Sequence, residues 1–138
     1  MSHYNIIVPG GTLYQGDAMS AATAAGKFDT LVLCAEELPR AALMLPKGVR
    51  VIEAGIDDAE LSPKEAWIAQ NAARSVVRDL GYGRKVLVTC FAGRNRSGLV
   101  SALTLKRMGY SGAEAIEAVR RARKNALTNE SFVRYLRA

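Results

Sequence analysis

The sequence predicts an α/β fold in which helices cover both faces of a central, mainly parallel sheet. Five short apolar runs, rich in β-branched residues, have the pattern of strands and lie at residues 4–8, 12–14, 30–34, 50–54 and 85–89. Segments between and after them carry apolar residues at helical spacing. Strands that alternate with helices form parallel sheets covered by those helices. We therefore expect helices to fill the gaps between the strands.

The longest predicted helix follows the fourth strand. Ser62 and Glu65 form a capping box, and Pro63 stands in the first helical turn. Apolar residues then recur at helical spacing up to position 80, and Gly81 and Gly83 end the pattern. These signals predict a helix that begins at Pro63.

Three further helices are expected in the second half of the chain. Residues 97–108 carry apolar side chains at helical spacing, directly after the fifth strand and its loop. Ser111 and Glu114 form a second capping box, which opens a helix with Ile116 and Val119 turned inward. A last helix is expected after Thr128.

Length and charge limit what the chain can be. With 138 residues, 49% of them hydrophobic, it can bury one core, and we expect a single domain over residues 1–138. No apolar run has the length of a membrane span or a signal peptide, so we expect a soluble, cytoplasmic protein. We also expect it to be a monomer. The net charge of +6 favours an anionic substrate. Its densest basic stretch, residues 120–124, is explained by cations that complement a helix C-terminus.

The loop between the fifth strand and the next helix carries the clearest chemical signal. Unpaired N–H groups and the positive end of the helix dipole attract an anion at a helix N-terminus. Arg96 adds a planar fork that matches two phosphate oxygens, and Gly93 allows a tight turn. Cys90, at the end of the strand, lies in the same field and should ionise more easily than a free cysteine. Cys90 as a buried structural cysteine is the alternative, but the combination favours a nucleophile beneath a bound phosphate.

The segment from Cys90 to Gly98 resembles the signature of the cysteine-dependent protein tyrosine phosphatase superfamily, in particular its small dual-specificity branch. In that signature a cysteine is followed by a five-residue loop, an arginine and a serine or threonine. Residues 13–16 and 29–36 are similar to other strands of these phosphatases. One position departs, because Thr89 stands where the family has a histidine.

The resemblance implies a dual-specificity phosphatase-like fold and hydrolysis of phosphate monoesters through a phosphocysteine intermediate, without metal or cofactor. It assigns Cys90 as the nucleophile, Arg96 as a phosphate ligand and Ser97 as the hydroxyl that serves the departing thiolate. The residues of the phosphate-binding loop would be Phe91, Ala92, Gly93, Arg94, Asn95 and Arg96.

A general acid is expected upstream, because expulsion of an alkoxide or phenoxide requires a proton. Asp57 and Asp58 follow the fourth strand. In the family pattern an apolar residue stands two places before the acid, so Ile56 and the spacing to Cys90 select Asp58. Asp57 is the alternative, and two adjacent carboxylates can also be ordinary solvated turn residues.

Cys34 ends the third strand, at a position that resembles a partner cysteine of some lipid-directed relatives. Oxidation that joins it to Cys90 would protect the nucleophile from irreversible damage. A plain core cysteine is the simpler interpretation.

Three functions stay open on the sequence. The first is a dual-specificity phosphatase that acts on phosphorylated proteins. The second applies the same chemistry to phosphoinositides or RNA 5′-phosphates, so that nucleic acid enters only as a substrate. It is favoured by the positive charge and by residues 93–98, which are similar to the loop of RNA triphosphatases in the superfamily. The third is a catalytically silent phosphate-binding module, which Thr89 favours and which the retention of Cys90, Arg96 and Ser97 opposes.

Overall fold

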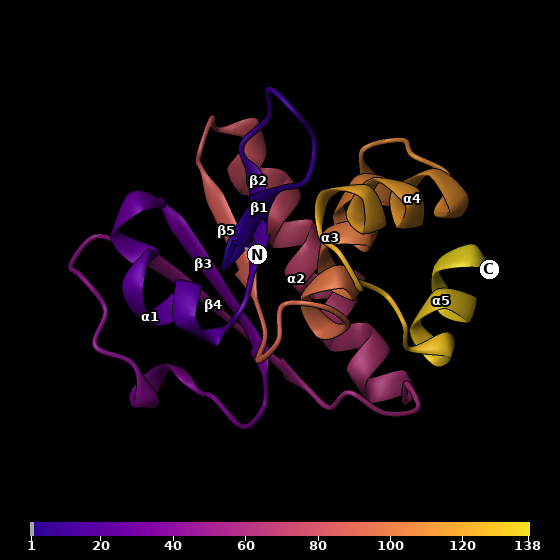
Figure 1. Ribbon diagram of the computed structural model, residues 1–138, viewed down its shortest axis with the longest axis horizontal. Coiled ribbons are helices and arrows are strands. Elements are labelled where there is room, and N and C mark those ends of the chain that lie inside the picture. The colour runs from indigo at the N-terminus through magenta and orange to yellow at the C-terminus, as the bar shows by residue number, and fades with distance from the viewer. Residues whose placement is uncertain (1) are drawn as a thin grey trace.

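A five-stranded sheet forms the centre of the protein in the computed structural model, which describes residues 2–138 (Figure 1). The strands are β1 (Tyr4–Ile6), β2 (Leu13–Gly16), β3 (Thr30–Ala35), β4 (Arg50–Ile56) and β5 (Val86–Thr89). Their order is β1-β2-β5-β3-β4, with β1 antiparallel to β2 and the other neighbours parallel. The predicted mainly parallel sheet is confirmed, and the strand ends differ from the predicted ones by at most two residues.

Helices cover both faces of the sheet, as predicted (Figure 1). One face is covered by α2 (Pro63–Gly81), α3 (Arg96–Arg107), α4 (Gly112–Ala122) and α5 (Glu130–Arg137). The other face is covered by the short α1 (Ala18–Thr23) and the turns that follow it. Both predicted capping boxes are present, at the starts of α2 and α4. Among residues 2–138, none of the helices combines the length and the apolar character that crossing a bilayer requires.

The apolar strands bury both of their faces. In β5, Val86 and Val88 point into the core under α2 to α5, whereas Leu87 points into the smaller core under α1. All three are fully buried. Because successive side chains of a strand alternate between the two faces, the continuous apolar run reflects a strand covered on both sides. The strand that precedes the Cys90 loop is therefore held rigidly at the centre of the sheet.

The gap between β3 and β4 contains no α-helix, so the expectation that helices fill every gap is wrong here. Residues 36–49 form one short 3₁₀ turn, Arg40–Ala42, within an irregular segment. Pro39 stands directly before that turn, and Pro46 and Gly48 (φ +89°) follow it. Proline and a left-handed glycine both interrupt helices, so the segment covers the sheet as an extended loop.

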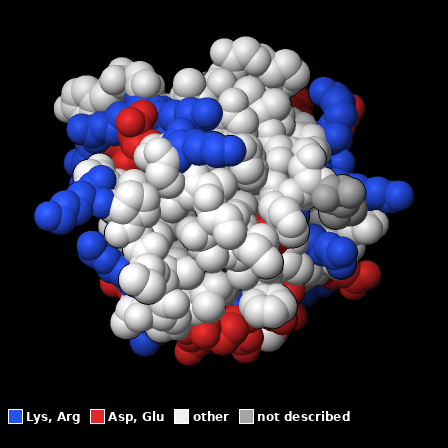
Figure 2. Space-filling model, turned by 60° about the vertical axis from the view of Figure 1, so that its left-hand side comes forward, with Lys and Arg blue, Asp and Glu red and all other residues white. Residues whose placement is uncertain are grey.

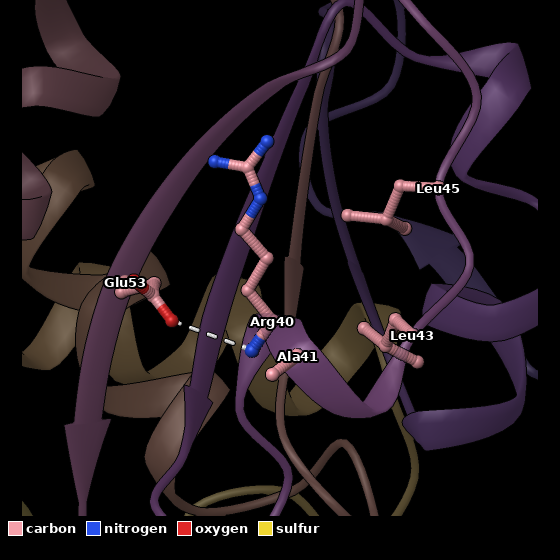
Figure 3. A pocket seen from close by; sticks show the side chains of 5 residues that line it. All are labelled: Arg40, Ala41, Leu43, Leu45 and Glu53. Carbon is pink, nitrogen blue, oxygen red and sulfur yellow. Dashed lines mark hydrogen bonds between the residues drawn. The ribbon is translucent and has the colours of Figure 1, made fainter.

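A shallow surface hollow lies where this segment passes over β4, and it is lined by Arg40, Ala41, Leu43, Leu45 and Glu53. Figure 3 shows the backbone N–H of Arg40 donating to a carboxylate oxygen of Glu53, a contact of 3.3 Å. Leu43 and Leu45 also pack against the smaller core. The hollow contains none of the predicted site residues. The Arg40–Glu53 hydrogen bond and the two leucines hold the segment against the sheet.

Asp79 fastens the far end of α2 to the amino ends of β3 and β4. Its carboxylate is fully buried. It accepts from Thr30 Oγ1 (2.7 Å), Arg50 Nε (3.1 Å) and Arg84 Nη1 (2.9 Å). A buried carboxylate is tolerated only when donors satisfy its oxygens, and here one hydroxyl and two guanidinium groups do so.

The parallel strands β2, β5, β3 and β4 end at the same edge of the sheet. Loops at the carboxyl ends of parallel strands are the usual location of ligand sites in α/β sheets. The loop that follows β5 lies at the middle of this edge, with β2 on one side and β3 on the other. The fold therefore brings the Cys90 loop together with the residues that follow β3 and β4.

Candidate active site

The loop between β5 and α3 starts at Cys90, directly after the central strand. The Cys90 N–H donates to the carbonyl of Gly16 (3.3 Å), which holds the start of the loop against the end of β2. Cys90 is buried, with 3% of its surface exposed. Its Sγ lies 3.1 Å from the hydroxyl oxygen of Ser97. The candidate nucleophile is thus in contact with the Ser97 hydroxyl, the group that the resemblance assigns to the departing thiolate.

The outer side of the loop is fastened by hydrogen bonds to its backbone carbonyls. Phe91 O accepts from the N–H of Ala18 at the start of α1 (3.0 Å). Arg94 O accepts from the N–H of Leu127, which precedes α5 (3.2 Å). Segments from both ends of the chain therefore fix the two sides of the loop.

The two carbonyls between them are held by side chains. Arg123, at the end of α4, donates from Nη2 to Ala92 O (3.2 Å) and from Nε to Gly93 O (2.6 Å). Gln15 of β2 donates from Nε2 to the same Gly93 O (3.1 Å). Four consecutive loop carbonyls are thus bonded to groups outside the loop.

These outward carbonyls determine where the loop amides point. A planar trans peptide directs its N–H opposite to its C=O, and none of the described peptide bonds is cis. The carbonyls of residues 91–94 therefore turn the N–H groups of residues 92–95 to the inside of the loop. None of these four N–H groups has a hydrogen-bond acceptor among residues 2–138. Converging backbone donors of this kind bind phosphate and similar oxyanions.

Gly93 is required at the tightest point of the loop. Its φ of +70° lies in the left-handed region, which side chains disfavour. A Cβ at this position would lie 2.6 Å from the carbonyl carbon and oxygen of Gly16. Both the turn and the close approach to β2 therefore depend on the absence of a side chain.

Arg96 begins α3, and its side chain is held by Glu37, which follows β3. Nη1 and Nη2 of Arg96 donate to the two carboxylate oxygens of Glu37, at 2.5 and 2.8 Å. Nη1 also donates to the carbonyl of Ile56 (3.2 Å). The hydrogen bond from Arg96 lowers the pKa of Glu37 to about 2, and the bond to Glu37 raises the pKa of Arg96. The guanidinium is therefore charged and fixed in orientation.

One edge of the Arg96 guanidinium remains free for a ligand. Its Nε is buried and has no partner among residues 2–138. Nε and the second hydrogen of Nη2 form the side edge of the fork, which matches two oxygens of a phosphate. A buried donor without an acceptor is costly, so the free Nε points to a site that an oxyanion completes.

Asp58 lies on the loop between β4 and α2, and its carboxylate contacts the Cys90 loop. Asn95 Nδ2 donates to Asp58 Oδ2 (3.1 Å), and Asn129 Nδ2 donates to Asp58 Oδ1 (2.8 Å). Asp57 is bound through its backbone N–H to a carboxylate oxygen of Glu65 (2.8 Å), at the start of α2. Of the two adjacent acids, the structure therefore places the side chain of Asp58 beside the loop.

The side chain of Thr89, which replaces the histidine of the family, does not donate a hydrogen bond to Cys90. Its hydroxyl donates to the carbonyl of Val32 (2.9 Å), across the sheet. The hydroxyl hydrogen is therefore engaged by β3 and is not available to Cys90. Ser97 is the side chain whose hydroxyl contacts the thiol.

Cys34 is completely buried in the same apolar core as Cys90, and both cysteines are free. Burial, followed by the charge of Cys90, raises the pKa of the Cys34 thiol well above its ordinary value. Cys34 is therefore a neutral thiol behind the loop. It contributes no phosphate ligand.

The basic residues near the loop differ in what they do. Arg94 is exposed, and its side chain makes no hydrogen bond within residues 2–138. Figure 2 shows a different face, that of α1 and residues 36–49. There Lys and Arg lie toward the margins, Asp and Glu gather along the lower edge, and the centre is uncharged. The positive charge is therefore not spread evenly over the protein surface. Within the loop, Arg94 is the exposed cationic residue whose side chain is available to a ligand.

Arg123 corrects one sequence-based interpretation. Arg120 and Arg121 lie in the last turn of α4, where the sequence predicts cations that complement the helix C-terminus, but Arg123 follows that turn and is only 3% exposed. Besides the loop carbonyls, it donates to Ser2 O (3.0 Å) and Asn5 Oδ1 (2.9 Å), and the Asp17 carboxylate lies 3.8 Å away. Burial lowers its pKa. This arginine forms the outer support of the loop.

Four residues that shape the site were not singled out from the sequence, namely Gln15, Glu37, Arg123 and Asn129. Each acts through a contact between segments far apart in the chain, for which neither spacing nor periodicity provides a signal. Asn129 has a local signal, since it caps α5 by accepting from the Phe132 N–H (3.2 Å), but that signal indicates a helix start and not a site.

The geometry combines a buried thiol, four free amide donors, a free guanidinium edge and a neighbouring carboxylate. The family model described as the catalytic domain of dual specificity phosphatases matches residues 13–138. The chain belongs to the dual-specificity phosphatase family. It is therefore a phosphatase of the cysteine-dependent protein tyrosine phosphatase superfamily, and the resemblance stated from the sequence is confirmed. No curated protein matches the chain in sequence.

Several solved phosphatase structures share the fold. Human DUSP28 superposes with a TM-score of 0.84 at 23% identity, covering 99% of this chain and 91% of that chain. A mouse putative dual specificity phosphatase, complexed with zinc tungstate, has a TM-score of 0.77 at 27% identity, covering 97% and 84%. PTPMT1 in complex with PI(5)P has a TM-score of 0.77 at 19% identity, covering 99% and 93%. The predicted dual-specificity phosphatase-like fold is thereby confirmed.

Proposed function

We propose that the protein hydrolyses phosphate monoesters in two steps, with Cys90 as the nucleophile. The observation that carries this proposal is the set of four inward-facing loop N–H groups, which have no acceptor in the described part of the chain, together with the buried thiol of Cys90. We infer that a phosphate held by these donors would present its phosphorus to the sulfur of Cys90. Preorganised donors of this kind stabilise the charge that develops on phosphoryl oxygens in the transition state.

In the first step Cys90 Sγ attacks phosphorus, and the bond to the leaving oxygen breaks. The loop amides and the free edge of Arg96 hold the three equatorial oxygens. Asp58 donates a proton to the leaving oxygen, which departs as an alcohol or phenol. Its carboxylate is adjacent to the loop through Asn95, which supports this role over one for Asp57.

In the second step water attacks the phosphocysteine, and Asp58 takes a proton from that water. The S–P bond breaks, inorganic phosphate is released, and the sulfur leaves as a thiolate. Ser97 Oγ lies 3.1 Å from that sulfur and donates to it as negative charge returns.

For the substrate, we propose phosphorylated proteins, which the family membership favours. Arg94 supports a second candidate. Its guanidinium is exposed and has no ion pair with residues 2–138, which favours a substrate with a further negative group beside the scissile phosphate. Phosphoinositides and 5′-triphosphorylated RNA have this chemistry, and PTPMT1, whose structure contains PI(5)P, has the same fold.

Phosphate release from a panel of phosphopeptides, phosphoinositides and triphosphorylated RNA tests the proposal, together with Cys90→Ser and Asp58→Ala. We expect Cys90→Ser to abolish turnover. Asp58→Ala should slow substrates with poor leaving groups severely and activated aryl phosphates less, since general acid catalysis contributes about 10²–10⁴-fold when the leaving group needs a proton. Turnover that survives in Cys90→Ser would refute the covalent mechanism. Equal losses on both substrate types would remove Asp58 as the acid.

A further inference from the structure

Asn95 makes an unusual set of contacts for a residue at the start of a helix. It occupies the N-cap position of α3, where an asparagine side chain normally accepts from the N–H groups of the first turn, but it makes no cap hydrogen bond. Its side chain instead reaches away from α3. Oδ1 accepts from the N–H groups of Thr128 (2.8 Å) and Asn129 (2.9 Å).

The amide nitrogen of the same side chain points to the candidate acid. Asn95 Nδ2 donates to Asp58 Oδ2 (3.1 Å) and to Thr128 Oγ1 (3.2 Å). One side chain in the phosphate loop therefore joins the loop after β4 to the loop before α5. Because the Asn95 side chain does not cap α3, the first turn of this helix lacks that stabilisation. The contacts that Asn95 makes instead therefore need another explanation.

Asp58 is held on both of its oxygens. Asn129 Nδ2 donates to Oδ1 (2.8 Å) and also to the carbonyl of Ala59 (2.9 Å). Asn129 is itself bound to Asn95 through its backbone N–H. Two donors on different oxygens fix the plane of a carboxyl group, which otherwise rotates about its single bonds.

We propose, resting on the function above, that Asn95 is a positioning residue that aims the carboxyl group of Asp58 at the leaving-group oxygen. Because Asn95 belongs to the loop that holds the phosphate, it sets the place of Asp58 relative to the phosphate itself. The position of the Asp58 carboxyl group then does not depend on the turn between β4 and α2 alone. A catalytic group displaced by about 1 Å can lose about a hundredfold in rate, so one hydrogen bond at this point has a large effect.

Asn95→Ala and Asn95→Asp separate this role from a structural one. Asn95→Asp retains an oxygen that accepts from the N–H groups of Thr128 and Asn129. It removes the donor to Asp58 and places a second carboxylate against it, and like charges at this distance repel. Asn95→Ala removes both functions. Asn71→Ala is the control, because Asn71 lies on α2 and its side chain donates to the Trp67 carbonyl (3.0 Å).

The assay compares para-nitrophenyl phosphate, an activated ester, with phenyl phosphate, whose leaving group needs the proton. Both Asn95 variants should lose about tenfold to a hundredfold in kcat on phenyl phosphate and much less on para-nitrophenyl phosphate. In the Asp58→Ala background the same substitutions should leave the ratio of kcat on the two substrates unchanged, because the group they position is gone. Asn71→Ala should match the wild type throughout. A negative charge that merely weakens phosphate binding would raise KM in both backgrounds.

Two outcomes would overturn the proposal. If Asn95→Asp behaves like the wild type while Asn95→Ala is impaired, only the backbone contacts matter and the role is structural. If the losses of Asn95→Ala and Asp58→Ala multiply in the double variant, the two residues act independently. These outcomes are distinct from failure of the proposed function, which would appear as turnover by Cys90→Ser.

Discussion

Replacing Arg123 with methionine removes two hydrogen bonds that orient the loop amides. Arg123 supplies the bonds to Ala92 O (3.2 Å) and Gly93 O (2.6 Å), and with them the inward direction of the next two N–H groups. Gln15 still holds Gly93 O after the change. The loop should therefore persist in a looser form, in which the Gly93 N–H is no longer fixed and the Arg94 N–H is held through Gln15 alone.

The magnitudes follow from these contacts. A hydrogen bond that involves a charged group contributes about 1.5–3 kcal/mol, and Gln15 and solvent compensate for part of the loss. We expect Arg123→Met to lower the free energy of unfolding by about 3 kcal/mol, which shifts Tm by roughly 10 °C for a domain of this size. Removal of one oxyanion donor costs about 10²–10³-fold in kcat, so releasing the Gly93 N–H should lower kcat/KM about a hundredfold.

The assay is kcat/KM on para-nitrophenyl phosphate, with competitive inhibition by inorganic phosphate and thermal unfolding measured beside it. Arg121→Met is the matched control, because Arg121 lies on the same helix, is exposed and pairs with Glu117 at the surface (2.6 Å). Arg123→Met should lose both turnover and phosphate affinity well below its Tm. If Tm falls while kcat/KM and phosphate inhibition match those of Arg121→Met, Arg123 stabilises the fold alone and the reasoning about the loop is refuted.

Three further predictions concern charge, stability and oxidation. Because Arg96 lowers the pKa of Glu37 from 4.5 to about 2, their ion pair adds stability above pH 4.5 that is lost as the pH falls toward 2. The Tm difference between the wild type and Glu37→Gln should thus be constant near neutral pH and shrink in that acid range; a difference that does not change would contradict the assignment. Asp79→Ala should lower the urea unfolding free energy by about 3 kcal/mol, because two guanidinium groups lose their buried partner, and leave kcat unchanged. An undiminished free energy would show that solvent replaces these contacts. With peroxide, Cys90 should form a sulfenic acid that the Cys34 thiol converts to a disulfide with release of water, so that reductant restores activity in the wild type but less in Cys34→Ser. Equal recovery, or peptide maps with only sulfinic or sulfonic Cys90, would exclude this pairing.

The strands and the loop were predictable because their signals are local. A run such as residues 85–89 must be buried on both faces to satisfy its apolar side chains, and Gly93 followed by a basic helix start indicates an anion site without any tertiary information. The capping boxes at Ser62 and Ser111 are local in the same way and fix the starts of α2 and α4.

The partners of the loop were not predictable, because their contacts join distant parts of the chain. Glu37 is 59 positions from Arg96, and its neighbour Glu36 has the same chemistry in the sequence. The course of the backbone after β3 determines that Glu37, and not Glu36, faces the Arg96 guanidinium. Arg123 stands among four other residues of a basic stretch, and only the packing of α4 against the loop distinguishes it from its solvated neighbours.

The carbonyls on the outer side of the loop are satisfied by β2, the start of α1, the end of α4 and the segment before α5. The working shape of this short peptide is thus a property of the assembled domain. Transplanted onto another scaffold, the same residues would lack their anchors and bind phosphate weakly. During folding, the ability to bind phosphate should arise late, when the C-terminal helices dock and the last hydrogen bonds to the loop carbonyls form.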